Sequence, residues 1–178
     1  MTLALLASLL CAAPEGQLLE LRQGTLTATV VHKLHEVRAT TRNLEGRALV
    51  QLDGTARVQV RAKVAAFDSG NSNRDEHMRE VTHDESHPYA TVKGTMEGVT
   101  LPLAAPAKTT LHAIVELNGE KQAVEVPLQL EPAAAGTRVK FSFPISLDAF
   151  KVERPELLFV KVDDRVVIEG DLLFEAAK

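Results

Sequence analysis

The sequence predicts a single all-β domain, an antiparallel β-barrel of about eight strands with one short helix. Three observations support this fold class. Apolar and polar residues alternate with period two along most of the chain, turns of hairpin length separate the runs, and no long helical pattern occurs. An antiparallel sheet built in this way either folds into a sandwich or closes into a barrel.

The clearest predicted strand spans residues 56–67. Its side chains Val58, Val60, Ala62 and Val64 fall on one face, whereas arginine, glutamine and lysine fall on the other. We therefore expect one face of this strand to be buried and the other to face water.

The remaining strands follow the same alternation. Residues 111–117 and 124–130 are joined by an Asn-Gly step at 118–119, whose positive φ angles suit a tight hairpin. Near the C-terminus we expect a closing hairpin in which residues 158–162 pair with residues 166–174. Further runs lie at residues 26–30, 48–52, 90–94 and 139–145.

Small residues on the predicted inner faces favour closure into a barrel, because these faces are rich in alanine, valine and glycine. Such residues do not fill the interior of a barrel of about eight strands, so an apolar space for a small ligand would remain. Small residues also let two sheets pack closely, which leaves a sandwich or a filled barrel open. The side chains predicted to line the pore are Ala28, Val30, His32, Val58, Val60, Ala62, Val64, Leu111, Ala113, Val115, Val126, Leu128, Phe141, Phe143, Leu172 and Phe174.

The N-terminus has the outline of a secretory signal peptide over residues 1–16, ahead of the barrel domain at 17–178. An apolar run at residues 3–10, too short to span a bilayer, is followed by Cys11 and two alanines. No lysine or arginine precedes this run, and the alternative is a short buried strand or helix at the start of the fold. The leader interpretation predicts export from the cytoplasm.

A polar insert at residues 67–89 interrupts the strands. Asn73, followed three residues later by Glu76, resembles a capping box, so we expect a short helix in the Asn73–Asp84 region. The helix should end before the His-Pro step, because proline biases the preceding residue toward extended conformations. Its predicted buried face consists of Met78 and Val81.

The insert resembles a known family. Phe-Asp-Ser-Gly-Asn-Ser-Asn-Arg-Asp-Glu-His-Met-Arg-Glu-Val at 67–81, followed by His-Pro-Tyr and a strand ending Lys-Gly-Thr at 93–95, is similar to the YceI-like family of lipocalin-like, polyisoprenoid-binding proteins. The segments at 32–37 and 44–46 and the closing strands resemble it more loosely, and the likeness covers Gly24 to Glu175. The structural motif consists of Asp68, Asn73, Arg74, Asp75 and His77.

This resemblance implies an extended lipocalin-like barrel whose pore holds a long apolar ligand: a polyisoprenoid, an isoprenoid quinone or a fatty chain. It implies a non-enzymatic carrier in the bacterial periplasm or outside the cell, with no cofactor beyond the bound ligand. Burial of the chain contributes about 0.8 kcal/mol per methylene, so such a ligand needs no charged contact.

His32 and the Arg74–Asp75 step are candidate polar contacts. Strand parity places His32 on the inner face, where it would hydrogen-bond a ligand head group or tie the strand to Asp68 or Asp75. Arg74 and Asp75 would form a buried pair that fixes the helix over one end of the barrel, since an unpaired buried charge is too costly.

A competing hypothesis is a zinc-dependent hydrolase that uses His77, His83 and His87. His83 and His87 have the four-residue spacing of a zinc-protease helix, but the proline after His87 argues against a continuous helix there. No nucleophilic triad or phosphate loop can be recognised from spacing, so an enzyme is the less favoured class.

Composition restricts the partners. With a net charge of −4, no Trp and one Tyr, the chain offers neither a basic surface nor stacking platforms for nucleic acid. No segment is long enough for an integral membrane span. The predicted partner is a hydrophobic small molecule or lipid, and a homodimer is left open.

Overall fold

The computed structural model describes residues 16–32, 35–154, 156–157 and 160–178. The predicted leader at 1–16 thus lies, except for Gly16, outside the described residues and stays a prediction. The domain boundary after residue 16 also stays a prediction.

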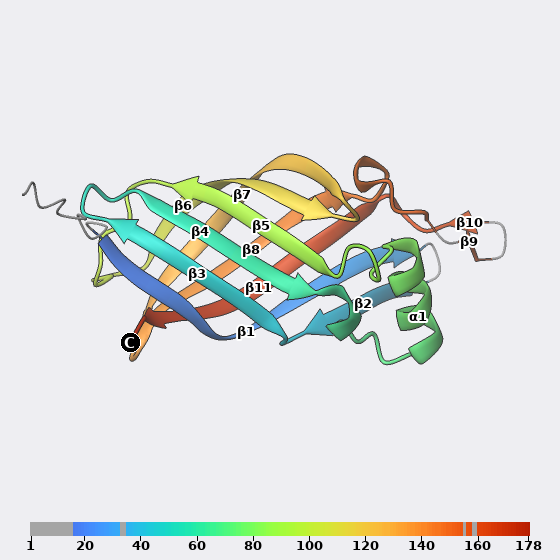
Figure 1. Ribbon diagram of the computed structural model, residues 1–178, viewed down its shortest axis with the longest axis horizontal. Helices are drawn as coiled ribbons and strands as arrows, with labels where there is room; N and C mark the ends of the chain where they lie inside the picture. The colour runs from blue at the N-terminus through green and yellow to red at the C-terminus, as the bar shows by residue number, and fades with distance from the viewer. Residues whose placement is uncertain (1–15, 33–34, 155, 158–159) are drawn as a thin grey trace, which may run out of the picture.

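A closed antiparallel barrel dominates the structure (Figure 1). Nine strands form one sheet in the order β11-β8-β7-β6-β5-β4-β3-β1-β2, and pairing of β11 with β1 closes eight of them into the barrel. The predicted all-β barrel of about eight strands is confirmed. The strands are β1 (Gly16–His32), β2 (His35–Thr41), β3 (Leu44–Gln51), β4 (Ala56–Lys63), β5 (Tyr89–Met96), β6 (Ala107–Leu117), β7 (Glu120–Ala133), β8 (Gly136–Ser146) and β11 (Arg165–Ala176).

Strand β1 closes the barrel because its partners change along its length. Its first residues pair with β3, where Leu18 lies opposite Leu49. From Leu19 onward it also pairs with β11, and a bulge between Leu21 and Gln23 shifts the register. Its last seven residues pair with β2, the extra strand at the edge of the sheet.

The predicted closing hairpin is wrong. Strand β11 pairs with β8, from Arg165 opposite Ser146 onward, and with β1, so its two edges are both occupied by barrel strands. The preceding segment instead contains two short strands, β9 (Glu156–Leu157) and β10 (Val160–Lys161), which pair with each other in a separate sheet. An eleven-residue strand such as β8 offers β11 far more ladder bonds than a two-residue strand does.

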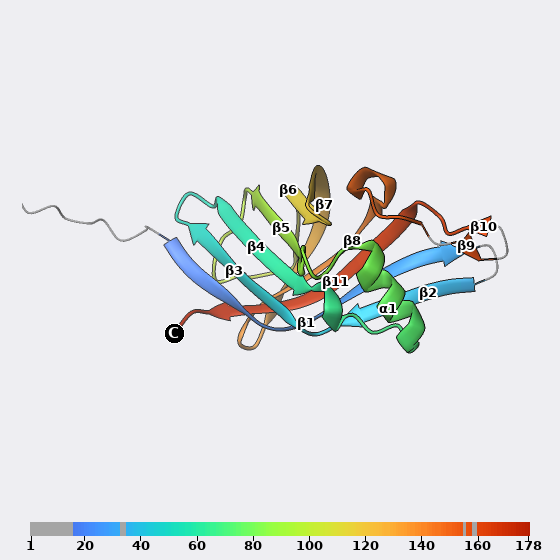
Figure 2. The ribbon, with the colours of Figure 1, turned by 45° about the vertical axis from the view of Figure 1, so that its right-hand side comes forward.

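The strand predicted over residues 56–67 is shorter than expected. Strand β4 ends at Lys63, and Val64–Ala66 form one turn of 3₁₀ helix, η1. The backbone N–H of Val64 donates to the carbonyl oxygen of Pro88, 2.9 Å away, but Pro88 has no N–H to return a bond, so the β4–β5 ladder ends here. This turn leads the chain to helix α1 (Ser72–Val81), which lies across one end of the barrel beside β2 (Figure 2).

The core follows the predicted strand parity. On β6, Leu111, Ala113 and Val115 are each at most 6% exposed, whereas the intervening Ile114 is 45% exposed. The same alternation of buried and exposed residues occurs along β7. The inner faces of the strands therefore meet in one apolar interior, as a barrel with a single apolar lining requires.

Candidate functional site

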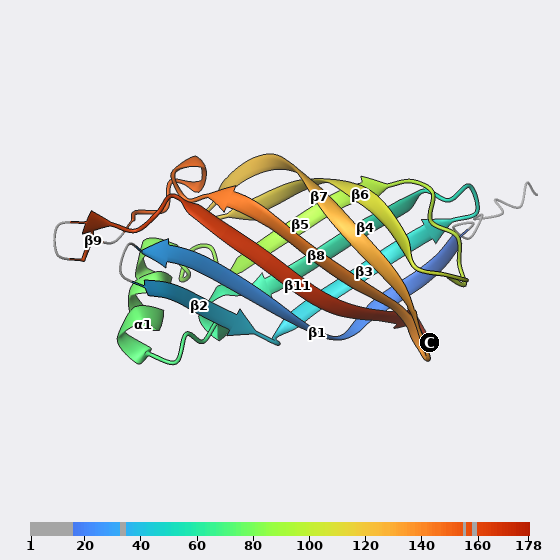
Figure 3. The same cartoon turned by 180° about the vertical axis from the view of Figure 1, so that it is seen from behind.

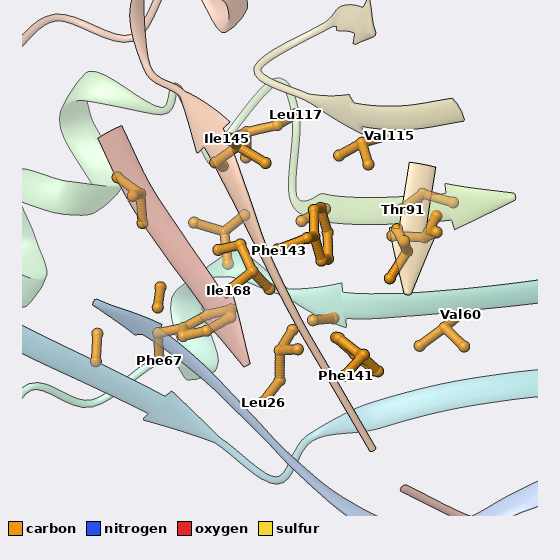
Figure 4. A pocket seen from close by; sticks show the side chains of 18 of the residues that line it. Leu26, Val60, Phe67, Thr91, Val115, Leu117, Phe141, Phe143, Ile145 and Ile168 are labelled. Carbon is orange, nitrogen blue, oxygen red and sulfur yellow. The ribbon is translucent and has the colours of Figure 1, made fainter. Parts of the chain in front are cut away.

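The interior of the barrel is not filled. It encloses a cavity of about 580 Å³ that is lined almost entirely by apolar side chains of the barrel strands. Figure 4 shows labelled side chains from several strands, among them Leu26, Val60, Phe143 and Ile168, around this space. The volume lies in the range of pockets that hold small molecules.

Of the predicted pore residues whose side chains the structure describes, all line this cavity except Ala113. Ala113 is buried in the core on the inner face of β6, close to the backbone of Gly94. The side chain of His32 lies outside the described residues, so its predicted role cannot be placed. That the lining residues contact a ligand stays a prediction.

Sequence reasoning missed part of the lining. Val37 and Ala39 of β2 line the cavity, and their alternation with Glu36 and Arg38 is a strand signal that could have found them. Loop residues also contribute, and no periodicity marks them, because they come from irregular backbone. Among them are Val99, Leu101, Leu147 and Val152.

Aromatic rings shape the middle of the cavity. The rings of Phe141 and Phe143 on β8 lie 6.0 Å apart between centroids, at an interplanar angle of 45°. Phe141 lies directly over Gly170 of β11, so closely that a side chain at Gly170 would collide with the ring. A glycine at this position therefore gives the ring its place against the wall.

Most of the polar part of the lining gathers at the α1 end. Ser69, Asn73, Arg74, His77 and Glu153 line the cavity, and all of them except the half-buried Ser69 are solvent-exposed. We call these five residues the polar rim. An apolar interior with an exposed polar rim can take an amphiphile, with its chain inside and its head at the surface.

Arg74 and Asp75 do not form the buried pair that the sequence suggested. Both bind the backbone of Ser69: Nη2 of Arg74 donates to its carbonyl oxygen at 3.0 Å, and Oδ1 of Asp75 accepts from its N–H at 3.0 Å. Arg74 is exposed, so its charge is solvated and needs no carboxylate partner. The two side chains thus fix the loop before α1 to the first turn of the helix.

The cap of α1 is Asn71 and not the predicted Asn73. Asn71 has extended backbone angles (φ −145°, ψ 111°), and its Oδ1 accepts from the N–H of Arg74 at 3.1 Å. Asn73 already lies inside the helix, where its side chain cannot cap. Met78 and Val81, the predicted buried face, are half-buried and line the cavity.

Asp68 and the histidines of the insert have local roles. Asp68 lies outside the cavity lining; its Oδ1 accepts from the N–H of Gly70 at 2.7 Å, and its backbone forms a bridge with Thr40 of β2. Nδ1 of His77 is 3.4 Å from Glu80 Oε2, and Nδ1 of His83 is 2.8 Å from Asn118 Oδ1.

The zinc hypothesis lacks the geometry it requires in the part of the chain that the structure describes. Helix α1 ends at Val81, and His83 has a positive φ of 49°, so His83 and His87 do not share a helix face. Among these residues no group of three His, Cys, Asp or Glu side chains comes together to hold a metal ion. No described helix is long and apolar enough to cross a membrane.

The closed antiparallel barrel with an apolar interior places the protein in the class of small β-barrels that enclose a cavity. The chain belongs to the YceI-like domain family, whose model matches residues 19–174. The family resemblance of the 67–95 segment is thereby confirmed. No curated protein matches the sequence.

Several solved structures share this fold. A polyisoprenoid-binding domain from Saccharophagus degradans, implicated in plant cell wall breakdown, is 19% identical with a TM-score of 0.69, covering 89% of this chain and 98% of that one. BcnA from Burkholderia cenocepacia is 18% identical with a TM-score of 0.70, covering 87% and 96%. A YceI protein from Campylobacter jejuni is 16% identical with a TM-score of 0.52, covering 68% and 72%.

Proposed function

We propose that this protein is a non-enzymatic carrier that holds one long apolar chain, a polyisoprenoid, an isoprenoid quinone or a fatty chain, in the barrel. The observation that carries the proposal is the unfilled apolar cavity of about 580 Å³. A structural module with a filled barrel would not need this space, because protein interiors are otherwise closely packed. The polyisoprenoid-binding relative supports the same ligand class.

The cavity suits a chain better than a charged substrate. Among the described residues, the only titratable side chains that line it are Arg74, Asp75 and His77 of α1 and Glu153. Deeper in the barrel, a charge would lose its hydration without a partner, whereas each buried methylene contributes about 0.8 kcal/mol. We therefore propose that the chain lies along the barrel with its polar head at the polar rim.

We also propose that the protein acts in the bacterial periplasm or outside the cell. The support for this is the apolar run at residues 3–10, which is followed by small residues as in a secretory signal. Cell fractionation, with mass determination of the mature protein, tests it. A protein that stays in the cytoplasm with residues 1–16 intact would contradict the proposal.

The carrier function is tested by native mass spectrometry and organic extraction of the purified protein. We expect a hydrophobic molecule at a stoichiometry of one per barrel, and we expect the extracted protein to bind a fluorescent polyene fatty acid such as cis-parinaric acid. Absence of a co-purifying molecule, together with no binding of this probe, would contradict the carrier proposal.

The zinc hydrolase stays the second candidate only by its histidine spacing. Metal analysis of the same preparation separates it from the carrier. A stoichiometric metal that is lost in both His83→Ala and His87→Ala would favour the hydrolase.

A further inference from the structure

The barrel wall has a seam between β7 and β8. Strand β7 pairs with β6 along almost its whole length, but its pairing with β8 begins only at Leu128, opposite Phe141, and runs from there to the turn that joins the two strands. Residues 120–127 of β7 and 142–146 of β8 therefore share no ladder pairs, and we call these two segments the seam. Figure 3 shows β7 arching away from β8 along this stretch.

A proline lies in each side of the seam. Pro127 directly precedes Leu128, the first β7 residue that pairs with β8, and Pro144 lies in the middle of the part of β8 that pairs with β11 but not with β7. Because proline has no N–H to donate, neither position can contribute a full pair of ladder bonds. The two prolines therefore oppose extension of the β7–β8 ladder across the seam.

Residues 147–152, which we call the seam loop, cover this part of the wall. The loop contains the 3₁₀ turn η2 (Asp148–Phe150) and closes on itself, since the N–H of Val152 donates to the carbonyl oxygen of Leu147 at 3.0 Å. Phe150 is 1% exposed and belongs to the core, and Leu147 and Val152 line the cavity. The loop is thus a compact element that covers the part of the barrel wall where β7 and β8 do not pair.

Side chains alone join the seam loop to β7 and to the β6–β7 turn, within the described residues. Nε2 of Gln122 donates to the carbonyl oxygen of Ala149 at 2.8 Å, and Nδ2 of Asn118 donates to that of Phe150 at 3.1 Å. Nζ of Lys151 lies 2.7 Å from Oε1 of Glu120. Separating the loop from β7 breaks these contacts but no backbone ladder.

The wall beside the seam is thin. A depression on the outer surface is lined by Pro127, Leu128, Phe141 and Ser142, together with neighbouring residues. Leu128 and Phe141 also line the interior cavity. Leu128 and Phe141 therefore border both the outer depression and the cavity at the point where the β7–β8 ladder ends.

We propose that the seam is a side entrance to the cavity and that the seam loop closes this entrance. This inference rests on the proposed carrier function, because it names the route that the apolar chain takes. Movement of the loop would expose Phe143 and Ile145 on the inner face of β8, so that a chain enters sideways and is not threaded along the barrel from its end.

A covalent lock tests the entrance. In a Cys11→Ser background, the pair Glu120→Cys and Lys151→Cys is joined by a short bis-maleimide, which ties the loop to β7. The matched control joins Arg138→Cys and Asp171→Cys, which replace an ion pair of 2.6 Å between β8 and β11, where the strands are continuously paired. Stopped-flow fluorescence with cis-parinaric acid gives the rates of loading and release, and equilibrium titration gives the affinity.

We expect the cross-link between residues 120 and 151 to slow loading and release by roughly tenfold or more. The affinity should change little, because a blocked entrance lowers both rates by the same factor. The control cross-link should leave both rates unchanged. Conversely, the double variant Glu120→Ala and Gln122→Ala should raise both rates, since it removes two of the contacts that hold the loop.

Equal loading rates in the locked protein and the control would overturn the side entrance and leave the polar rim as the route, with the carrier function intact. Failure of the unmodified protein to bind the probe at equilibrium would overturn the carrier function and the entrance together.

Discussion

Gly170 illustrates how a single residue sets the shape of the cavity. Its lack of a side chain lets the ring of Phe141 lie close against β11, so that less of the ring extends into the cavity that it lines. A larger side chain at this position would overpack the wall, which costs about 1–3 kcal/mol of stability because side chains must leave their preferred rotamers.

The substitution Gly170→Val should therefore push the Phe141 ring into the cavity. We expect a lower unfolding temperature and weaker binding of cis-parinaric acid, both measured against the parent protein. Glu169→Ala is the control, because Glu169 is exposed on the same strand and does not line the cavity. Unchanged affinity in Gly170→Val would show that the ring does not limit the space for the ligand.

A second prediction concerns Asp171, on the outer face of the same strand. Arg138 donates to both carboxylate oxygens, Nε to Oδ1 at 2.6 Å and Nη2 to Oδ2 at 2.7 Å, which lowers the pKa of Asp171 below its ordinary value of 3.8. The folded-state pKa is thus below the unfolded one. The contribution to stability is complete above the unfolded pKa and is lost as the pH falls through the folded pKa.

The effect on unfolding should be small, since both side chains are more than a third exposed and solvent screens the pair. We expect the Asp171 carboxyl titration, followed by NMR, to have its midpoint below 3.8 and to move back toward this value in Arg138→Gln. If the midpoint were the same in Arg138→Gln as in the parent protein, Arg138 would not be the cause of the lowered pKa of Asp171.

At the scale of elements, helix α1 gives a prediction that separates two possible caps. Asn71→Ala should lower the free energy of unfolding by about 1 kcal/mol, because Oδ1 of Asn71 accepts from the N–H of Arg74. Asn73→Ala should be neutral or slightly stabilising, since alanine has the higher helix propensity at an exposed position inside a helix. Urea unfolding of both variants measures this, and the reverse order of stabilities would make Asn73 the cap.

The error over the cap shows what sequence can and cannot predict here. Asn71 and Asn73 both belong to a Gly-Asn-Ser-Asn run, and each is followed by residues that can begin a helix. The choice between them depends on where the chain leaves Asp68, whose backbone is held by Thr40 of β2. A long-range contact therefore decides a local feature.

The strands show the same division. Parity correctly predicted which side chains of β4, β6 and β7 face inward, because alternation is a local property. The partner of β11 could not be predicted in this way, since its pairing with β8 and β1 depends on barrel closure. The seam loop could not be predicted from the sequence either, because its buried Phe150 lies in irregular backbone, where apolar residues follow no period.

At the scale of the whole molecule, an unfilled interior links stability to ligand binding. The strands enclose about 580 Å³ of apolar space, and side chains that border such space lose packing contacts. A ligand that binds only the folded state stabilises it by about 2.7 kcal/mol at a concentration one hundred times its dissociation constant. The extracted protein should therefore unfold at a lower temperature than the protein reloaded with a long fatty acid.

The substitution Val60→Phe tests this coupling. Val60 lines the cavity and lies beside Gly46 of β3, so a phenyl group at this position fills interior space. We expect the empty variant to unfold at or above the temperature of the empty parent, and a long fatty acid to raise that temperature less than it does in the parent. Gln59→Phe is the control, because this neighbour on β4 does not line the cavity. If Val60→Phe kept the full ligand-induced rise, the chain would have to bind elsewhere, because the same space cannot hold both the phenyl group and the ligand.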